Sequence, residues 1–198
     1  MARGIIIFGS SGSGKTTLGK IVAKQLNYPY FDLDEYIWRN DTEIPFTVMY
    51  SRDEKVSRLM NDISRYEHFV MAGSMNSFNK PFVPLFDLAV HITADTELRI
   101  ARIQKREHDL YGERILEGGD MYENHKKFIQ NSICYDKDGS PCLKTHLEWA
   151  ETLPCNVIYL NGGDELEKNS KLIVDKYLMS VNNWVENYIL EIPKELHH

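Results

Sequence analysis

The sequence predicts an α/β fold in which helices cover a parallel β-sheet. Short, continuous apolar runs bounded by turn residues recur along the chain, as expected for strands that are buried on both faces. Helical patterns lie between these runs, and such alternation favours parallel strands joined by right-handed crossovers. With 198 residues the chain has the length of one domain.

Each element follows from its own stretch of sequence. The apolar runs are short and bounded by turn residues, which predicts strands. In chain order the expected strands are GIIIF at 4–8, the shorter candidate YFD at 30–32, FVMAG at 69–73, LAVHI at 88–92 and NVIYL at 156–160. The expected helices span residues 15–26, about 50–66, 95–109, 120–134, 143–152 and 164–180.

Two stretches interrupt the alternation. Residues 40–49, NDTEIPFTVM, form a polar to apolar connection, and residues 109–120, DLYGERILEGGD, form a charged loop with several glycines. We expect both to be mobile covers over a site. The tail at 181–198 is expected to be an appended helix followed by a frayed end.

Composition excludes several classes of function. The formal net charge is −6, whereas general nucleic-acid binding depends on clustered Lys and Arg. No apolar run approaches the roughly 20 residues that span a bilayer, and the start of the chain lacks a secretion signal. The three cysteines lack zinc spacing and predict reduced thiols in a cytoplasmic setting. We expect no nucleic-acid or membrane partner, and a monomer or homodimer.

Residues 9–16, GSSGSGKT, match the pattern Gly-x-x-x-x-Gly-Lys-[Ser/Thr] between an expected strand and an expected helix. Such a loop wraps backbone N–H groups around phosphate oxygens, and its glycines permit close approach. Lys15 reaches the outer phosphates, and the Thr16 hydroxyl ligates Mg²⁺. The expected ATP-binding residues of the loop are Gly9, Ser10, Ser11, Gly12, Ser13, Gly14, Lys15, Thr16 and Thr17.

A pair of carboxylates follows the second expected strand in FDLDEYIW, at Asp32 and Asp34. In a parallel sheet, strand ends beside a phosphate loop border the ligand. A hydroxyl acceptor must lose a proton as it attacks phosphorus, whereas a phosphate acceptor is already an anion. The pair therefore favours an alcohol-bearing acceptor. The alternative for Asp34 is the N-cap of a helix.

Together, GSSGSGKTT and FDLDEYIW resemble the phosphate loop and the Asp-x-Asp motif of the nucleoside monophosphate kinase-like P-loop kinases, in particular their shikimate and gluconate kinase branch. The resemblance covers most of residues 1–162. It implies the three-layer α/β/α P-loop NTPase fold, with a five-stranded parallel sheet in the order 2-3-1-4-5 and a mobile lid. It also implies that Asp32 helps to hold Mg²⁺ through water and that Asp34 contacts the acceptor hydroxyl.

The resemblance extends to the acceptor side. YSRDE at 50–54 is similar to the Phe-Arg-x-x-Glu element of shikimate kinases, with the Arg one place nearer the Glu. This implies that Arg52 binds an anionic group of the acceptor, and a solvated helix Arg is the alternative. The third expected strand ends in AGS at 72–74, where shikimate kinases carry three glycines and Gly73 is the match. That departure argues against shikimate itself, and the lack of Asp-Gly-Phe-Pro argues against AMP.

Arg99, Arg102 and Arg106 lie at helical offsets and form one basic stripe, a pattern that is most often solvated surface. RIQKR at 102–106 reproduces the Arg-x-x-x-Arg pattern that leads into the lid in this kinase group. By resemblance, Arg102 or Arg106 lies along the adenine or the phosphates, and Arg114 reaches in from a lid at about 107–119. A guanidinium delivered by loop closure neutralises the charge that develops during transfer.

Other polar residues are expected to have structural roles. Asp120 is a natural N-cap for the helix that follows it. For His91 and His125 we expect structural positions.

The sequence thus predicts an ATP- and Mg²⁺-dependent kinase domain at 1–180, with an acceptor-side segment at about 34–60, that phosphorylates a small-molecule hydroxyl. The expected catalytic residues are Lys15, Asp34, Arg106 and Arg114. One alternative is a nucleoside or nucleoside monophosphate kinase, and another is a nucleotide-binding switch or ATPase without a small acceptor. Asp34 separates the last class, because a hydrolytic switch needs a residue that positions water.

Overall fold

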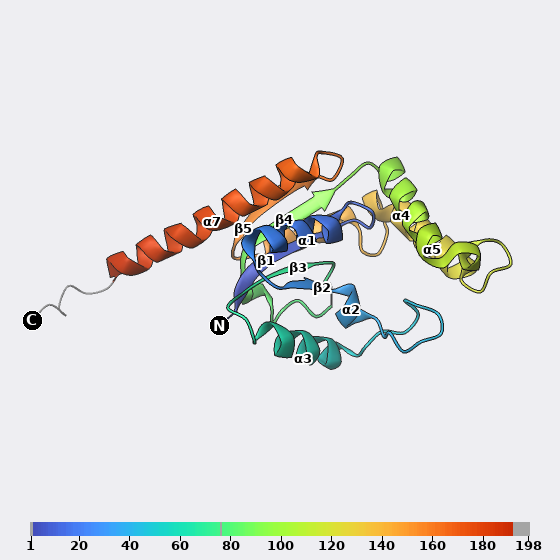
Figure 1. The fold of residues 1–198 in the computed structure, drawn as a ribbon, viewed down its shortest axis with the longest axis horizontal. Coiled ribbons are helices and arrows are strands. Elements are labelled where there is room, and N and C mark those ends of the chain that lie inside the picture. Colours follow the sequence, from blue (N-terminus) through green and yellow to red (C-terminus); the bar gives the residue numbers. More distant parts are fainter. Residues whose placement is uncertain (1, 76, 192–198) are drawn as a thin grey trace, which may run out of the picture.

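The computed structural model describes residues 2–75 and 77–191, with side chains through Val181. Five parallel strands form one sheet in the order β2-β3-β1-β4-β5 (Figure 1). The strands are β1 (Arg3–Gly9), β2 (Tyr30–Asp32), β3 (His68–Ala72), β4 (Phe86–Thr93) and β5 (Asn156–Asn161). The parallel sheet that the sequence pattern predicted and the strand order that the resemblance implied are both confirmed.

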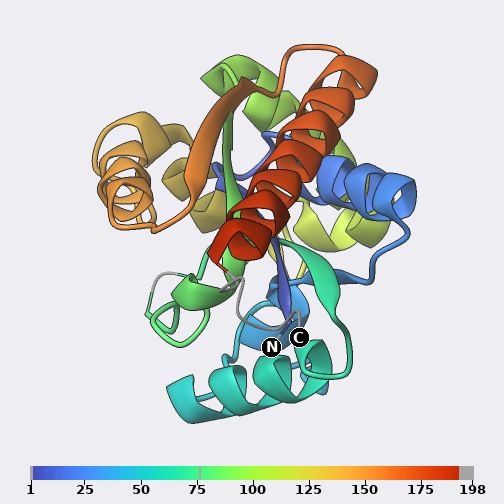
Figure 2. The ribbon, with the colours of Figure 1, turned by 90° about the vertical axis from the view of Figure 1, so that its left-hand side faces the viewer.

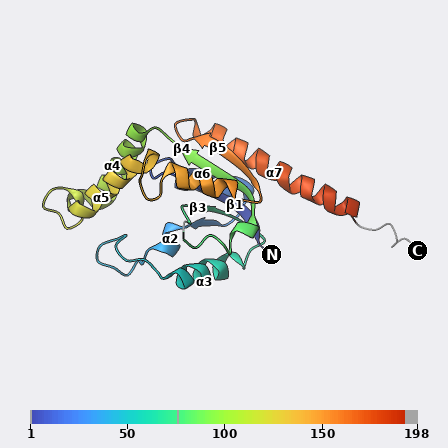
Figure 3. The same ribbon diagram turned by 180° about the vertical axis from the view of Figure 1, so that it is seen from behind.

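Helices cover both faces of this sheet (Figures 2 and 3). Helices α1 (Lys15–Leu26) and α7 (Leu166–Glu191) lie against one face, and α3 (Arg52–Ile63) and α6 (Leu143–Glu151) against the other. The short α2 (Asp34–Ile37) follows β2, and three 3₁₀ helices complete the described elements: η1 (Val83–Leu85), η2 (Gly112–Ile115) and η3 (Cys134–Asp136). Helices α4 (Thr96–Tyr111) and α5 (Tyr122–Ile133) project together beyond the carboxyl end of the sheet (Figure 1).

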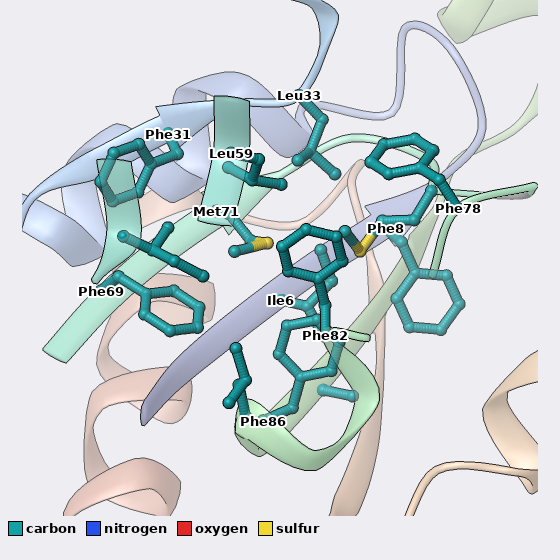
Figure 4. Close-up of a cluster of buried hydrophobic side chains, with 14 of the residues drawn as sticks. Ile6, Phe8, Phe31, Leu33, Leu59, Phe69, Met71, Phe78, Phe82 and Phe86 are labelled. Carbon is teal, nitrogen blue, oxygen red and sulfur yellow. The ribbon is translucent and has the colours of Figure 1, made fainter. Parts of the chain in front are cut away.

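The central strand β1 explains why the sheet is buried on both sides. Ile5 and Ile7 pack with side chains of α1 and α7, whereas Ile6 and Phe8 pack with side chains of α3 and α6. A continuous apolar run is the pattern that such a strand requires. Figure 4 shows the cluster on the α3 side. Its labelled side chains are Ile6, Phe8, Phe31, Leu33, Leu59, Phe69, Met71, Phe78, Phe82 and Phe86.

The predicted loop at 109–120 is wrong at its start, because α4 continues to Tyr111. The helix ends where Gly112 adopts a φ of 54°, and η2 then begins at once. Ile115 and Met121 are buried within this tip. The segment is therefore the folded tip of a helical hairpin formed by α4 and α5, because its buried apolar side chains hold it in place among the charged residues.

The connection at 40–49 is also ordered by backbone pairing. An antiparallel bridge joins Trp38 to Met49, and the Arg39 N–H donates to the Val48 carbonyl at 2.8 Å. Sequence reasoning gave this stretch no structure, because its polar and apolar residues follow neither the period of a helix nor that of a strand.

Helix α7 runs without a break across residue 180, the expected end of the kinase domain. The described part of the 181–198 extension is therefore helical through Glu191, and residues 192–198 lie outside the described residues. In the described chain, no helix combines the length and the apolar character that crossing a bilayer requires. Cys134, Cys142 and Cys155 are free thiols.

Arg99 does not belong to a solvated basic stripe, because its side chain is fully buried. Its guanidinium donates to the carbonyls of Ala94 at 2.8 Å and Ser132 at 2.9 Å, and it pairs with Asp136. These bonds tie the start of α4 to the end of α5 and to η3. Arg99 is thus a structural residue at the base of the projecting hairpin.

Replacing Arg99 with alanine should lower the free energy of unfolding by about 3 kcal/mol, because buried carbonyl oxygens would lose a charged donor. Lys105→Ala on the same helix is the matched control. Lys105 is exposed, and among the described residues it forms an (i, i+4) pair with Asp109 alone, so its loss should cost about 0.5 kcal/mol or less. Urea denaturation measures both values, and equal losses would contradict the structural role of Arg99.

Candidate active site

The loop between β1 and α1 has the backbone shape of a phosphate-binding loop. Gly9, Gly12 and Gly14 adopt φ angles of 143°, 76° and 102°. A Cβ atom at Gly9 would lie 1.9 Å from the Ile92 carbonyl oxygen, and one at Gly12 would lie 2.4 Å from the Arg99 carbonyl oxygen. These positions exclude side chains on steric grounds, and the first turn of α1 leaves its N–H groups without intrahelical partners.

One carbonyl organises the loop. The Ser10 carbonyl oxygen accepts hydrogen bonds from the Ser13 hydroxyl at 2.8 Å and from Lys15 Nζ at 2.7 Å. Ser10 and Ser13 are buried, Ser11 is half-buried, and the threonines that follow Lys15 are exposed. The buried Ser10 hydroxyl has no hydrogen-bond partner among the described residues. Loop and lysine are thus held together before any ligand arrives.

Burial lowers the pKa of Lys15 to about 8. The carboxylates of Asp34 and Asp32 act in the opposite direction, and the Arg106 and Arg99 guanidinium groups add to the lowering. Because burial disfavours the charged form of this lysine, an anionic ligand beside it stabilises the ammonium strongly. The structure therefore brings Lys15, both aspartates and Arg106 into one electrostatic site.

Asp32 and Asp34 lie where β2 ends and α2 begins. The Asp34 backbone N–H donates to Asp32 Oδ1 at 3.2 Å, and the Tyr30 hydroxyl lies 3.4 Å from Asp32 Oδ2. Tyr30 therefore contacts the carboxylate of Asp32, one of the two residues that the sequence proposed for Mg²⁺.

Asp34 is the first residue of α2 and not its cap, because Leu33 occupies the N-cap position and no side-chain capping bond forms. The capping alternative is thus not what the structure shows. Although solvent reaches Asp34, the surrounding protein restricts its hydration and raises its pKa. The neighbouring Asp32 charge raises it further, whereas Lys15 and Arg106 oppose the rise. A carboxylate with a raised pKa is a stronger proton acceptor.

Arg102 and Arg106 separate into different environments one turn apart on α4. Arg102 Nη1 donates to the Gly162 carbonyl at 3.0 Å and lies 3.4 Å from the Gly12 carbonyl oxygen. It thus bridges the phosphate loop and the turn after β5. Arg106 is about half exposed, pairs with Glu107 at 3.2 Å, and acts electrostatically on Lys15 and Asp34.

Arg114 lies in the hairpin tip and faces the acceptor-side segment. Its guanidinium forms two bonds to the Asp120 carboxylate, at 3.0 Å and 2.7 Å, and a third to the Glu43 carbonyl at 3.3 Å. The structure gives the N-cap of α5 to Met121, so the expectation that Asp120 caps this helix is wrong. Asp120 is instead the ion-pair partner of Arg114 in the hairpin tip.

Two residues expected at the acceptor have backbone contacts. Arg52 Nε donates to the Ser77 carbonyl at 3.1 Å and is otherwise exposed. Gly73 follows β3 with a φ of 135°, and a Cβ atom there would lie 2.7 Å from Leu33 Cβ. Gly73 is therefore required for the close approach of β3 to the start of α2, which carries Asp34.

Sequence reasoning missed two cations on α3. Lys55 is buried, its ammonium lies 3.5 Å from Met49 Sδ, and no carboxylate of the described chain forms an ion pair with it. The Arg58 guanidinium stacks on the Tyr50 ring at 3.9 Å, and its Nη1 is buried without a hydrogen-bond partner in the described residues. A helical charge pattern alone does not distinguish such buried cations from solvated ones.

Comparison with known proteins supports this reading of the loop. The profile of the AAA_18 family, described as an AAA domain, matches residues 5–130. The protein YqaC of Bacillus subtilis (strain 168) is 29% identical over 182 residues, which cover 91% of this chain and 99% of YqaC. The shikimate kinase of Psychrobacter arcticus is 23% identical over 111 residues, 51% of this chain and 59% of that enzyme.

Among solved structures, the shikimate kinase from Acinetobacter baumannii in complex with shikimate is similar, with a TM-score of 0.55. It is 16% identical, and the match covers 90% of this chain and 94% of that one. At this identity the likeness concerns the fold. The predicted enzyme class, a phosphotransferase, is the class of the two shikimate kinases among these proteins. The chain thus belongs to the AAA_18 family, described as an AAA domain, and it is similar to shikimate kinases.

Proposed function

We propose that this protein is an ATP- and Mg²⁺-dependent kinase that transfers the γ-phosphoryl group to a hydroxyl of a small-molecule acceptor. One arrangement carries the proposal: Asp34 follows β2 at the end of the sheet where the phosphate loop carries Lys15, and its pKa is raised although Lys15 and Arg106 oppose the rise. Proton acceptor and phosphate-binding cations are thus on the same end of the sheet. The kinase relatives support the same reaction class.

The residues present fit a nucleotide and its metal ion. Gly9 and Gly12 leave no room for side chains, and the buried Ser10 hydroxyl has no hydrogen-bond partner among the described residues. Thr16 and Asp32 would hold Mg²⁺, which typically takes only one or two protein ligands alongside phosphate and water. When bound, the ion neutralises charge on the phosphates.

Each group of the chain then has a distinct task. Lys15 binds the outer phosphate oxygens. Before the nucleotide binds, the hydrogen bond to the Ser10 carbonyl holds Lys15 in the loop. Arg106 supplies positive charge near the phosphoryl group, where negative charge develops during transfer. Arg102 lies beside the phosphate loop and contacts the nucleotide. Asp34 accepts the proton of the acceptor hydroxyl as that oxygen attacks phosphorus. Arg114 joins the site when the hairpin tip closes.

The acceptor side favours an anionic compound. Arg52, Lys55 and Arg58 all come from α3, and Lys55 is a buried cation whose described partners are a thioether and, at 6.0 Å, the Phe78 ring. A buried ammonium without a carboxylate partner is costly unless an anion compensates it. A hydroxylated carboxylic acid combines that anion with the hydroxyl that Asp34 requires.

The discriminating experiment measures ADP release with ATP and Mg²⁺ in the presence of single candidate acceptors. The panel contains sugar acids, cyclic hydroxy acids, neutral polyols, nucleosides and nucleoside monophosphates. We expect stimulation by a hydroxy acid. Stimulation by a nucleoside or its monophosphate instead would favour the nucleotide kinase alternative, and an acceptor-independent rate that no compound raises would favour a switch or ATPase.

Closure of the tip should depend on nucleotide, because Arg114 must leave Asp120 to reach the phosphates. Hydrogen exchange of the backbone amides of residues 112–119 should slow by about 10-fold or more when a non-hydrolysable ATP analogue and Mg²⁺ bind. The exposed turn at 137–139 serves as an internal control that should not change. Equal exchange in the tip with and without the analogue would rule out this closure.

A further inference from the structure

A buried chain of polar side chains ends beside the proposed acceptor. The Ser74 hydroxyl lies 3.2 Å from His146 Nε2, His146 Nδ1 lies 2.8 Å from the Tyr135 hydroxyl, and that hydroxyl lies 3.2 Å from His91 Nε2. His146, Tyr135 and His91 are buried, whereas Ser74 is half-buried. This hydrogen-bonded row of side chains thus leads from the interior to a single accessible hydroxyl, that of Ser74.

Ser74 is placed among the ligand-facing groups by its position in the sheet. It follows Gly73 at the carboxyl end of β3, and β3 pairs with β2, whose end carries Asp32. Behind it, the His146 ring packs against Phe8 at 5.6 Å between centroids, one residue before the phosphate loop starts at Gly9. The hydrogen-bonded row of side chains therefore lies between the hydrophobic core and the candidate active site.

Both histidines are neutral at ordinary pH. Burial, with a smaller contribution from the Lys15 ammonium, lowers the pKa of His91 to about 4. Burial, with smaller contributions from His91 and Lys15, lowers the pKa of His146 to about 3. Each ring then carries one proton, on one of its two nitrogens. These hydrogen-bonded side chains cannot act through a change of charge, so they act through the direction of their hydrogen bonds.

The single Tyr135 proton couples the two rings. If Tyr135 donates to His91 Nε2, it accepts from His146 Nδ1–H, and His146 Nε2 then accepts from Ser74. If Tyr135 donates to His146 Nδ1, His91 and His146 both carry their protons on Nε2, and His146 donates to Ser74. In the second state the Ser74 proton is free for another acceptor. In the first state only the Ser74 lone pairs are free.

We propose that Ser74 hydrogen-bonds a polar group of the phosphoryl acceptor, and that His146, Tyr135 and His91 are positioning residues that set the direction of the Ser74 hydroxyl. The inference rests on the proposed function, and it assigns Ser74 to a group of the acceptor other than the hydroxyl that Asp34 deprotonates. An acceptor oxygen without a proton selects the state in which both rings are protonated on Nε2.

The kinetic test uses the acceptor found with the panel. Ser74→Ala should raise the KM for that acceptor by about 5- to 20-fold, while the KM for ATP changes less than about twofold. Ser74→Thr, which keeps a hydroxyl, should restore most of the affinity. Ser57→Ala is the control, because Ser57 is exposed on α3 and, of the residues described, its hydroxyl bonds just the Glu54 carbonyl. Tyr135→Phe should raise the acceptor KM without removing any contact to ATP.

The spectroscopic test uses ¹⁵N-histidine NMR on the unliganded protein. Between about pH 5 and 8, His91 and His146 should remain neutral and share the same tautomer, and Tyr135→Phe should remove that correlation. Opposite tautomers, or an imidazolium signal from either ring, would overturn the coupling.

The two tests separate the possible failures. If the panel yields no acceptor, the proposed function fails and the ligand assigned to Ser74 fails with it, while NMR still decides the coupling. If an acceptor is found but Ser74→Ala behaves like Ser57→Ala, the kinase assignment stands and the role of Ser74 is refuted.

Discussion

Lys15→Ala should lower phosphoryl transfer by about 100-fold or more while the protein keeps its fold. Lys15 is half-buried, and within the part of the chain that the structure describes its ammonium bonds one group, the Ser10 carbonyl, at 2.7 Å. Its main partner is therefore the ligand phosphate, so its loss removes stabilisation of the charge that develops during transfer. Calorimetry should show weaker ATP binding. Lys24→Ala, an exposed lysine on the same helix, should change neither quantity.

The pH dependence of ATP binding follows from the same residue. The pKa of Lys15 is about 8 without ligand, and phosphate binding favours its charged form. Below pH 8 the ammonium is already present, so binding takes up no proton. Above pH 8 binding must take up a proton, and affinity falls as pH rises. Lys15→Arg should remove this decline, because an arginine stays charged.

Normal ATP affinity and normal turnover in Lys15→Ala would refute the phosphate-loop assignment.

The sheet and the phosphate loop were predictable because their signals are local. A strand buried on both faces needs a continuous apolar run, and 4–8 supplies one. The loop after it needs residues without side chains at fixed places, and Gly9 and Gly12 meet backbone atoms there. Both requirements act over a few residues, so they are written in consecutive positions of the sequence.

The roles of the α4 arginines were not predictable from spacing. Arg99, Arg102 and Arg106 share one stripe in a helical projection, yet Arg99 is buried, Arg102 bridges two loops, and Arg106 remains about half exposed. Helical periodicity states which residues share a face. It does not state which end of that face α5 and η3 will cover.

The Ser74–His146 pair was invisible for a related reason. The two residues are 72 positions apart, and they meet only because α6 returns over the face of the sheet that carries the β3 end. Treating His91 as a structural residue from the sequence agrees with its burial. That prediction could not include the hydrogen bonds that connect His91, through Tyr135, to an accessible hydroxyl.

Replacing Asp34 with asparagine should cut turnover at saturating substrates by about 10²- to 10⁴-fold, the usual loss for a positioned general base. Asparagine keeps the shape of the side chain, and Leu33, not Asp34, occupies the cap of α2, so the fold should persist. ATP affinity should barely change. Glu35→Gln is the matched control, because Glu35 is the next residue of α2 and is exposed.

The pH profile identifies the proton acceptor independently of the size of that loss. Desolvation and the Asp32 charge raise the pKa of Asp34, so wild-type kcat should fall on the acid side through a pKa higher than that of a solvated aspartate. Asp34→Asn should lose this acid limb, because its side chain does not titrate. A nucleoside monophosphate acceptor arrives ionised and needs no base. Therefore a loss under about threefold, with the acid limb intact, would transfer the assignment to a nucleotide kinase.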